Sequence, residues 1–281
     1  MIFGLTAALG WGFSDFGAAV VGRRMGSLAT LLVAQAAEVV TILLMVLVVR
    51  PVWTMTPGIA AGIVANGLFA AGAYAMLYRA LELGPVALVS PVVAAYAVIT
   101  IILAVTVLGE SVPSIVLLGG LVTVAGVVLT TTDPRQLGGP AARKKGGLPY
   151  ALGATGCFGF AAFLLGRYSQ EVGWLPTLTL SRLATMGCLW TAALVLRPRF
   201  QGAAATTVLA AIVVGILDVL GASAFARGAE LGYVSIVAAA SAIFPLIPVV
   251  GGVVLLRERP ALTQYVGVGV VIGGLLLLSR G

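Results

Sequence analysis

Residues 78–84 read YRALELG and residues 226–232 read ARGAELG, so one short stretch occurs twice, with arginine, glutamate, leucine and glycine at the same spacing. The two arginines, Arg79 and Arg227, are 148 residues apart (227 minus 79). The same offset continues downstream, where Gly126 aligns with Gly274. Each copy begins a block made of a long apolar run, a break that contains glutamate, and a second, glycine-rich apolar run. A repeat of this length, built from hydrophobic segments, is typical of a duplicated membrane protein.

The composition is that of a protein embedded in lipid. Hydrophobic residues make up 60% of the chain and charged residues 9%, whereas a soluble domain carries about 25% charged residues. A water-soluble protein of this length could not cover its surface with so few charges, so we predict an all-α, multi-pass membrane protein. The net charge of +7 comes mainly from basic residues at the ends of apolar runs. There they suit lipid headgroups and membrane topology better than nucleic acid, which we do not expect as a partner.

Ten apolar runs approach the length of roughly 20 residues that a helix needs to cross a bilayer. The runs lack an alternating pattern and are about twice the length of a membrane-spanning strand, which excludes a β-barrel. Most links between them are short and marked by arginine, proline or glycine, so neighbouring helices should run antiparallel. The ten predicted helices are Ile2–Val21, Leu28–Val49, Pro57–Tyr78, Pro85–Leu108, Ser111–Thr131, Leu148–Gly166, Leu175–Leu196, Ala203–Ala226, Tyr233–Leu256 and Ala261–Leu278.

The longest polar break, Thr132–Gly147, lies at the centre of the chain and separates two halves. The early parts of the halves align at an offset of 147, so that Gly26 matches Gly173 (173 minus 26). Each half therefore holds five helices. Because five is odd, the second half must enter the membrane inverted relative to the first. We predict a first five-helix repeat at residues 1–133, a basic inter-repeat loop at residues 134–147 and a second five-helix repeat at residues 148–281.

The basic residues in the breaks are distributed unequally between the two sides of the membrane. Eleven follow the odd-numbered helices and four lie on the opposite side, so the positive-inside rule, taken alone, places both termini outside. The eleven are Arg23, Arg24, Arg79, Arg135, Arg143, Lys144, Lys145, Arg197, Arg199, Arg257 and Arg259. The four are Arg50, Arg167, Arg227 and Arg280.

Four charged residues lie inside the apolar runs: Asp15, Glu38, Arg182 and Asp218. A charge in hydrocarbon costs roughly 3 kcal/mol or more, so such residues normally face the interior of the bundle. Asp15, in the first helix, could bind a proton or a cation in turn, which is the chemistry of a coupled exchanger. It could equally be a structural carboxyl group that is hydrogen-bonded to a neighbouring helix.

The second and seventh helices carry polar groups at matching positions. Gln35 and Glu38 are three residues apart and share a helix face, and Arg182 matches Gln35 at the offset of 147 (182 minus 35). The two groups could therefore face each other across a central cavity. Arg182 could bind a substrate carboxylate, or it could be neutralised by Glu38 or Asp218 for structure alone, with Asp218 as its most economical partner.

Polar and aromatic stripes mark further helices that could line a substrate path. On the third helix, successive members of one stripe are four residues apart: Asn66, Ala70, Tyr74 and Tyr78. On the ninth helix, prolines are expected to interrupt the backbone hydrogen bonds, and broken helices at membrane depth often line substrate paths. The interruption is marked by Ser235, Ser241, Pro245 and Pro248. The complete set of candidate substrate-binding residues is Trp11, Ser14, Asp15, Gln35, Glu38, Asn66, Tyr74, Tyr78, Tyr96, Arg182, Asp218 and Ser241.

The chain contains no histidine, which excludes Ser–His nucleophiles, His-ligated zinc and a histidine proton relay. Cys157 and Cys188 both lie inside apolar runs, so we expect core residues rather than a disulfide or metal site. We expect no catalytic residue, no metal and no cofactor. An intramembrane enzyme acting on lipids or peptides is the alternative hypothesis, and a structural or sensory membrane partner is a third. Saturable uptake into proteoliposomes would separate a carrier from both.

Several short motifs occur in a characteristic order along the chain. The first half contains WGFSDF at residues 11–16, YRAL at 78–81, Pro91 and LGE at 108–110, and the second half contains Ala229, Pro245 and Glu258. Glycines 119, 126, 267 and 274 complete the pattern. Together these motifs resemble the EamA-type, ten-helix branch of the drug/metabolite transporter (DMT) superfamily, and the resemblance covers nearly the whole chain.

The resemblance implies a basket of ten helices, with a central cavity formed by helices 1–4 and 6–9 and with helices 5 and 10 outside. Members of the family move amino acids, other metabolites or drugs, usually outward, by alternating access, and keep both termini in the cytoplasm. Asp15 lies at a depth similar to that of the essential glutamate of the four-helix small multidrug resistance relatives. We therefore expect a secondary transporter of the cell (inner) membrane that exports small polar metabolites such as amino acids or organic cations. We further expect coupling to protons through Asp15, and a monomer or homodimer in the lipid bilayer.

Overall fold

A computed structural model of the protein describes residues 1–83, 89, 92–131, 147–196, 203–247 and 261–278. Over these residues the chain is helical and contains no strand. The described helices are α1 (Ile2–Met25), α2 (Ser27–Val49), α3 (Pro57–Leu83), α5 (Tyr96–Val107), α6 (Ser114–Thr131), α8 (Gly147–Val172), α9 (Trp174–Leu196), α10 (Ala205–Leu231), α11 (Val234–Ser241) and α13 (Leu262–Leu278). Each overlaps one of the ten predicted runs. Residues 134–146 of the predicted inter-repeat loop, Pro91, Pro248 and Glu258 lie outside the described residues, and Gly147 is the first residue of α8.

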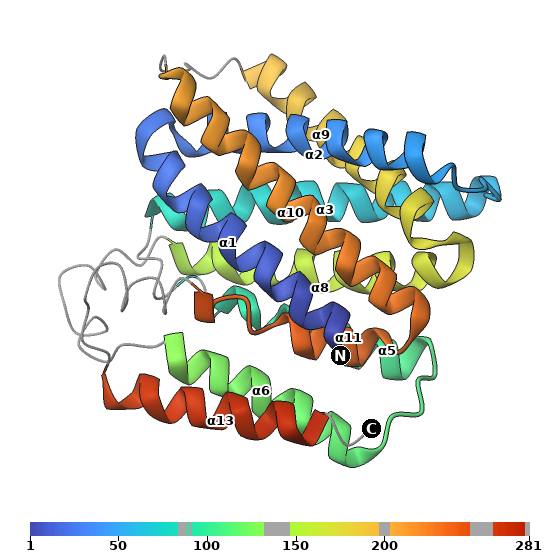
Figure 1. The fold of residues 1–281 in the computed structure, drawn as a ribbon, viewed down its shortest axis with the longest axis vertical. Coiled ribbons are helices and arrows are strands. Elements are labelled where there is room, and N and C mark those ends of the chain that lie inside the picture. Colours follow the sequence, from blue (N-terminus) through green and yellow to red (C-terminus); the bar gives the residue numbers. More distant parts are fainter. Residues whose placement is uncertain (84–88, 90–91, 132–146, 197–202, 248–260, 279–281) are drawn as a thin grey trace.

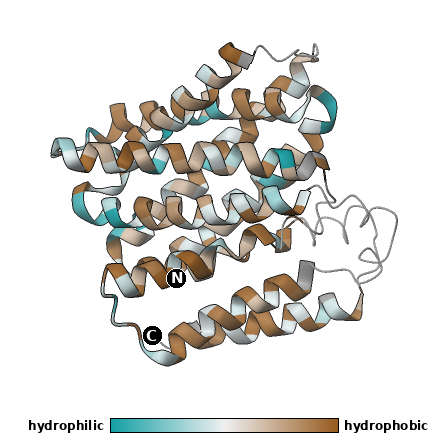
Figure 2. Cartoon of the chain, turned by 180° about the vertical axis from the view of Figure 1, so that it is seen from behind, coloured by the Kyte–Doolittle hydropathy of each residue, from teal (hydrophilic) through white to brown (hydrophobic). Residues whose placement is uncertain are grey.

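The outer surface of the bundle is apolar. Five helices, α2, α3, α8, α9 and α10, contain spans long and apolar enough to cross a membrane, and three shorter apolar helical stretches accompany them. Large hydrophobic side chains are left exposed, as at Val48, which is 82% exposed, and Val195, which is 75% exposed. Hydrophobic residues predominate along the helices, whereas many hydrophilic segments lie near helix ends (Figure 2). Apolar surface on this scale suits lipid rather than water, which confirms the prediction of an all-α membrane protein.

Two one-residue turns join neighbouring helices in the same way in both halves. Gly26 separates α1 from α2 with φ 87°, and Gly173 separates α8 from α9 with φ 91°, a conformation that favours glycine. The Thr30 hydroxyl donates to the Gly26 carbonyl at 2.9 Å, and the Thr177 hydroxyl donates to the Gly173 carbonyl at 2.8 Å. The offset of 147 that aligns the glycines also aligns the threonines (177 minus 30), so the duplication is preserved in detail.

The two halves of the chain interleave rather than form separate bundles. α1 packs mainly against α10, and α3 packs mainly against α8. The first helix of each half also crosses the fourth helix of the other half at a glycine. A Cβ atom on Gly12 would lie 2.7 Å from the Phe244 carbonyl oxygen, and one on Gly159 would lie 3.2 Å from the Tyr96 carbonyl oxygen. At these matched crossings, the first helix of each half packs closely against the fourth helix of the other half.

α6 and α13 form a pair at the edge of the molecule (Figure 1). They pack closely against each other and contact the rest of the described bundle through α5 and α11. The resemblance implied this peripheral position for the fifth and tenth helices. The beginning of α1 and the end of α13 lie toward the same side of the bundle (Figure 1), as an even number of membrane crossings requires.

The fourth and ninth helices are both interrupted, and at equivalent positions. Before α5, the Ala95 amide donates to the Val92 carbonyl at 3.2 Å, and after α11, the Phe244 amide donates to the Ser241 carbonyl at 3.2 Å. Both bonds span three residues, as in a 3₁₀ turn, instead of the four of an α-helix. The turn at Ala95 and the turn around Ile243 differ by 148 residues (243 minus 95). The prediction of an interrupted ninth helix is therefore confirmed.

The LGE motif caps a helix of the opposite half. Glu110, in the link between α5 and α6, accepts the amide of Val234 at 2.6 Å and the amide of Ser235 at 3.2 Å. These are amides of the first turn of α11, which have no partner inside their own helix. A carboxylate at a helix N-terminus is also favoured by the helix dipole. Glu110 thus fastens the start of the ninth helix to the link between the fourth and fifth helices.

We predict that Gly215→Ala destabilises the protein because this glycine is the contact between α10 and α2. An added Cβ atom would overlap the carbonyl oxygen of Ala34, which belongs to the backbone and can yield only if the helices separate. Overpacking of this kind costs about 1–3 kcal/mol. The melting temperature in detergent should fall accordingly. Gly269→Ala is the matched control, since no atom of the described residues lies within 4 Å of the position of its Cβ atom. Equal losses in the two variants would contradict the proposed contact.

Candidate functional site

A cavity of about 100 Å³ lies inside the bundle between helices of both halves. Since one water molecule needs at least about 10–15 Å³ by the same measure, the space could hold roughly seven waters or a small metabolite. Its walls come from α1, α3, the fourth helix, α8, α9, α10 and the ninth helix. The lining residues are Trp11, Asp15, Asn66, Ala70, Tyr74, Leu77, Val93, Tyr96, Phe158, Ala161, Ala162, Leu165, Leu178, Ser181, Arg182, Asp218, Ala222, Phe225 and Phe244.

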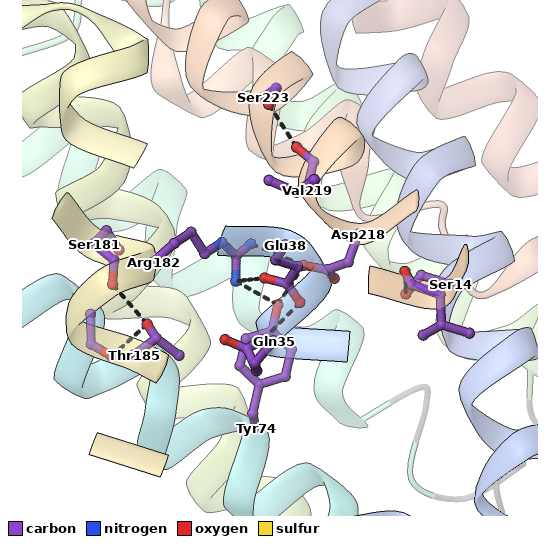
Figure 3. A network of polar contacts seen from close by, with 12 residues as sticks. Ser14, Gln35, Glu38, Tyr74, Ser181, Arg182, Thr185, Asp218, Val219 and Ser223 are labelled. Carbon is purple, nitrogen blue, oxygen red and sulfur yellow. Dashed lines mark hydrogen bonds and ion pairs between the residues drawn. The ribbon is translucent and has the colours of Figure 1, made fainter. Parts of the chain in front are cut away.

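A buried ion-pair network stands beside this cavity (Figure 3). The Arg182 guanidinium group on α9 lies between Glu38 on α2 and Asp218 on α10, with N–O distances of 3.0 Å to each carboxylate. The Tyr74 hydroxyl on α3 accepts from Arg182 at 3.1 Å and donates to Asp218 at 3.0 Å. The Gln35 amide donates to Glu38 at 2.7 Å. Four helices are thereby joined through one positive charge.

Burial makes this network strong and also makes it costly to break. Arg182, Glu38 and Asp218 are 6%, 1% and 7% exposed. A buried ion that loses its partner cannot be compensated by water, so removing one member of such a pair is far more harmful than its net contribution suggests. Both sequence-based partners of Arg182, Glu38 and Asp218, are bound to it. In this structure Arg182 is therefore neutralised by Glu38 and Asp218, which is the structural alternative raised by the sequence.

Asp15 is half-buried and differs from the buried charges of the network. Its carboxyl group lines the cavity from α1, and within the described part of the chain it forms no hydrogen bond or ion pair. Trp11 lies four residues earlier on the same helix and therefore on the same face, and it lines the cavity as well. Within the described residues, the cavity thus presents an unpaired carboxyl group on the same helix face as a tryptophan.

Aromatic rings form much of the remaining wall. Trp11 packs against Phe225 with ring centroids 5.6 Å apart and meets Tyr96 edge-on at 6.5 Å. Tyr96 in turn lies 6.5 Å from Phe244. Its hydroxyl is 2.7 Å from the Ser241 hydroxyl, so a hydrogen bond joins the interrupted fourth and ninth helices directly. The rings make the wall continuous across both halves of the chain.

The cavity is nearly symmetric in shape and asymmetric in chemistry. Six pairs of lining residues are related by the internal repeat, at offsets of 147 or 148. In three pairs both members are large and apolar or aromatic. In the other three a polar residue of one half has alanine at the equivalent position of the other half. The first three are Trp11 with Phe158, Leu77 with Phe225, and Tyr96 with Phe244; the second three are Asp15 with Ala162, Ala70 with Asp218, and Tyr74 with Ala222.

The candidate residues from the sequence fall into two groups. Seven line the cavity: Trp11, Asp15, Asn66, Tyr74, Tyr96, Arg182 and Asp218. Five are not among its lining residues: Ser14, Gln35, Glu38, Tyr78 and Ser241. Of these five, Gln35 and Glu38 support Arg182, Ser241 bonds to Tyr96, and the Ser14 hydroxyl donates to the Val214 carbonyl at 3.1 Å. Gln35 and Arg182 do not face each other across the cavity, because Glu38 lies between them in the network.

Sequence reasoning missed several lining residues, chiefly Phe158, Phe225, Phe244 and Ser181. A lone phenylalanine in an apolar run carries no signal of its own. The internal repeat could have found the three phenylalanines, since each aligns with a first-half residue that also lines the cavity. Among the described residues, no group of three or more histidine, cysteine, aspartate or glutamate side chains could hold a metal ion.

Comparisons with known proteins agree with this architecture. The model of a family described as "EamA-like transporter family" matches residues 1–132 and 145–280, which supports the prediction of two inverted five-helix repeats. A solved structure titled only "Crystal structure of protein" is 20% identical, has a TM-score of 0.79, and covers 99% of this chain and 96% of that chain. At this identity the likeness shows a shared fold alone. No curated protein matches the chain.

We predict that Arg182→Ala strongly destabilises the protein, because it leaves two buried carboxylates without their cation. Loss of one partner from a buried network costs about 3–5 kcal/mol, which would be read as a large fall in melting temperature in detergent. The matched control is Arg167→Ala, which removes an exposed pair with Glu171 and should cost less than about 1 kcal/mol. Adding Glu38→Gln and Asp218→Asn to Arg182→Ala should recover much of the lost stability. A fully stable Arg182→Ala protein would contradict the network.

Proposed function

The chain belongs to the EamA-like transporter family, and on that premise we propose that it is a secondary transporter that exports small polar metabolites across the cell (inner) membrane by alternating access. Family membership makes it a membrane transporter of the drug/metabolite type. Its cargo, its direction of transport and its coupling are the substance of the proposal. A family of transporters also favours this function over an intramembrane enzyme acting on lipids or peptides.

The cavity is the observation that carries the proposal. It lies between the two repeats, inside a bundle whose outer surface is apolar, and it combines charged, amide and hydroxyl groups with aromatic walls. Small-molecule sites are typically apolar hollows with a few well-placed polar groups. In transporters built from inverted repeats, such sites lie at the interface between the repeats. A purely structural membrane protein has no need of a polar hollow at this place.

The interrupted helices support alternating access. The fourth and ninth helices are both broken beside the cavity, at positions related by the repeat, and the Tyr96–Ser241 hydrogen bond joins them. Helix breaks are positions where a small change in backbone angles can tilt one segment relative to the next. Paired breaks would let each half of the protein open the cavity toward one side of the membrane in turn.

Asp15 is the group that we assign to coupling. It faces the cavity without an ion pair among the described residues, whereas Glu38 and Asp218 are held by Arg182. A carboxyl group that is free to gain and lose a proton can exchange that proton for cargo during each cycle.

We place both termini in the cytoplasm, and a reporter fused to either end would test this orientation.

We predict that the purified full-length protein, reconstituted into proteoliposomes, moves small polar solutes with saturable kinetics. Candidate cargo should first be selected by thermal shift against amino acids and organic cations, since a ligand that binds the folded state raises the melting temperature. Protein-free liposomes provide the background. Failure to move any solute that binds in the screen would contradict the transporter proposal.

We predict that Asp15→Asn abolishes uptake driven by a pH gradient while leaving the protein folded. The amide matches the carboxyl group in shape but cannot carry a proton through the cycle. Uptake should be measured with and without an imposed gradient, alongside melting temperature. Glu171→Gln removes an acid that is paired with Arg167 outside the cavity, and it should leave gradient-driven uptake intact. Unchanged gradient-driven uptake by Asp15→Asn would rule out its coupling role.

A further inference from the structure

The charges beside the cavity do not balance. Arg182 is the basic residue of its lining, and both Glu38 and Asp218 already bind it. Asp15 faces the same space with no ion pair within the described residues. Three carboxyl groups and one guanidinium group leave the site deficient in positive charge. We propose that the cavity selects small organic monocations with Asp15 as counter-ion and rejects cargo that carries a free carboxylate. This inference rests on the proposed transport function and specifies its cargo.

Arg182 is poorly placed to receive a carboxylate from cargo. To do so through its two terminal nitrogens it would have to release Glu38 or Asp218, each at 3.0 Å, and leave that acid buried without a partner. Its Nε atom has no hydrogen-bond partner among the described residues, but it is itself buried beside these two acids. The Tyr74 hydroxyl holds the same guanidinium group at 3.1 Å and closes the network further (Figure 3). A further carboxylate in this region would be repelled by the acids already there and would lack a partner of its own. Zwitterions are therefore disfavoured relative to cations of the same size.

The wall beside Asp15 suits an ammonium group. Trp11 lies on the same face of α1 as Asp15, and its ring continues into those of Phe225 and Tyr96. Aromatic faces attract cations through their quadrupole, and tryptophan does so best. An ammonium ion placed here would gain a charge partner and an aromatic face together, while its apolar body would contact the remaining rings.

A second polar group indicates what else the cargo carries. Asn66 is 2% exposed and lines the cavity, and its Nδ2 atom has no hydrogen-bond partner among the described residues. A buried donor left without an acceptor is unfavourable, so cargo that brings a neutral oxygen to this amide would bind better. The preferred class is thus a small ammonium ion with a hydroxyl or carbonyl group.

Three related ligands test this class with the full-length protein in detergent. Leucinol is a monocation with a hydroxymethyl group, leucine carries a carboxylate in place of that hydroxymethyl group, and isopentylamine has neither. Binding measured by calorimetry should be at least about tenfold tighter for leucinol than for leucine, a difference of one well-made polar contact. The affinity for isopentylamine should be lower than that for leucinol but higher than that for leucine. Leucine binding as tightly as leucinol would overturn the proposal without the need for any variant.

Two variants assign the contacts. Asp15→Asn should weaken leucinol and isopentylamine alike, by about tenfold or more. Asn66→Ala should lower the affinity for leucinol to that for isopentylamine and leave the affinity for isopentylamine unchanged. Glu171→Gln, an acid outside the cavity, is the control and should bind all three ligands as the parent protein does. Cation binding that survives in Asp15→Asn would overturn the role of Asp15.

The outcome for cargo can be distinguished from the outcome for transport. If proteoliposomes accumulate leucine but not leucinol, the cargo assignment fails and the transporter proposal stands. If leucinol binds as predicted but no solute is moved, the transporter proposal fails and the cation site stands. Uptake of leucinol that is saturable and is competed by isopentylamine would support both.

Discussion

A single guanidinium group held by two carboxylates organises the interior of this protein. Lipid offers no hydrogen-bond partners, so a charge that is buried between the helices needs its partners from the protein itself. Arg182 meets this requirement by binding Glu38 and Asp218, and Tyr74 and Gln35 complete the set. These five residues come from four different helices. The network can exist only when those helices hold one arrangement, which makes it a determinant of the fold as well as a wall of the site.

Duplication explains the shape of the cavity, and divergence explains its chemistry. Equivalent positions of the two halves face the same space, as Tyr96 and Phe244 do from the interrupted helices. Where chemistry is needed, one copy keeps a polar group and the other has alanine, as with Asp15 and Ala162. A symmetric hollow with polar groups on every wall would have to desolvate twice as many of them. The observed division leaves room for cargo and confines the polar groups to a few defined places.

Much of the fold follows from periodicities in the sequence, whereas the pairing of side chains does not. Ten apolar runs, their lengths and the offset between repeated motifs predict the helices, and Gly26 and Gly173 mark the same turn in both halves. The offset cannot reveal that the halves interleave, because packing of α1 against α10 depends on surface shape at positions such as Gly10 and Gly221. The partners of Arg182 were foreseen from the scarcity of buried charges. The position of Gln35 behind Glu38 was not, since a helix face shared by two residues does not say which of them points further inward.

The one-residue turns at Gly26 and Gly173 have a mechanical consequence. A connection this short allows no slack along the helix axis, so α1 cannot slide past α2, nor α8 past α9. The two helices of each pair can still tilt relative to each other about the glycine. Since the two pairs belong to opposite halves and have opposite orientations in the bilayer, the turns permit tilting of these helices but not sliding along their axes.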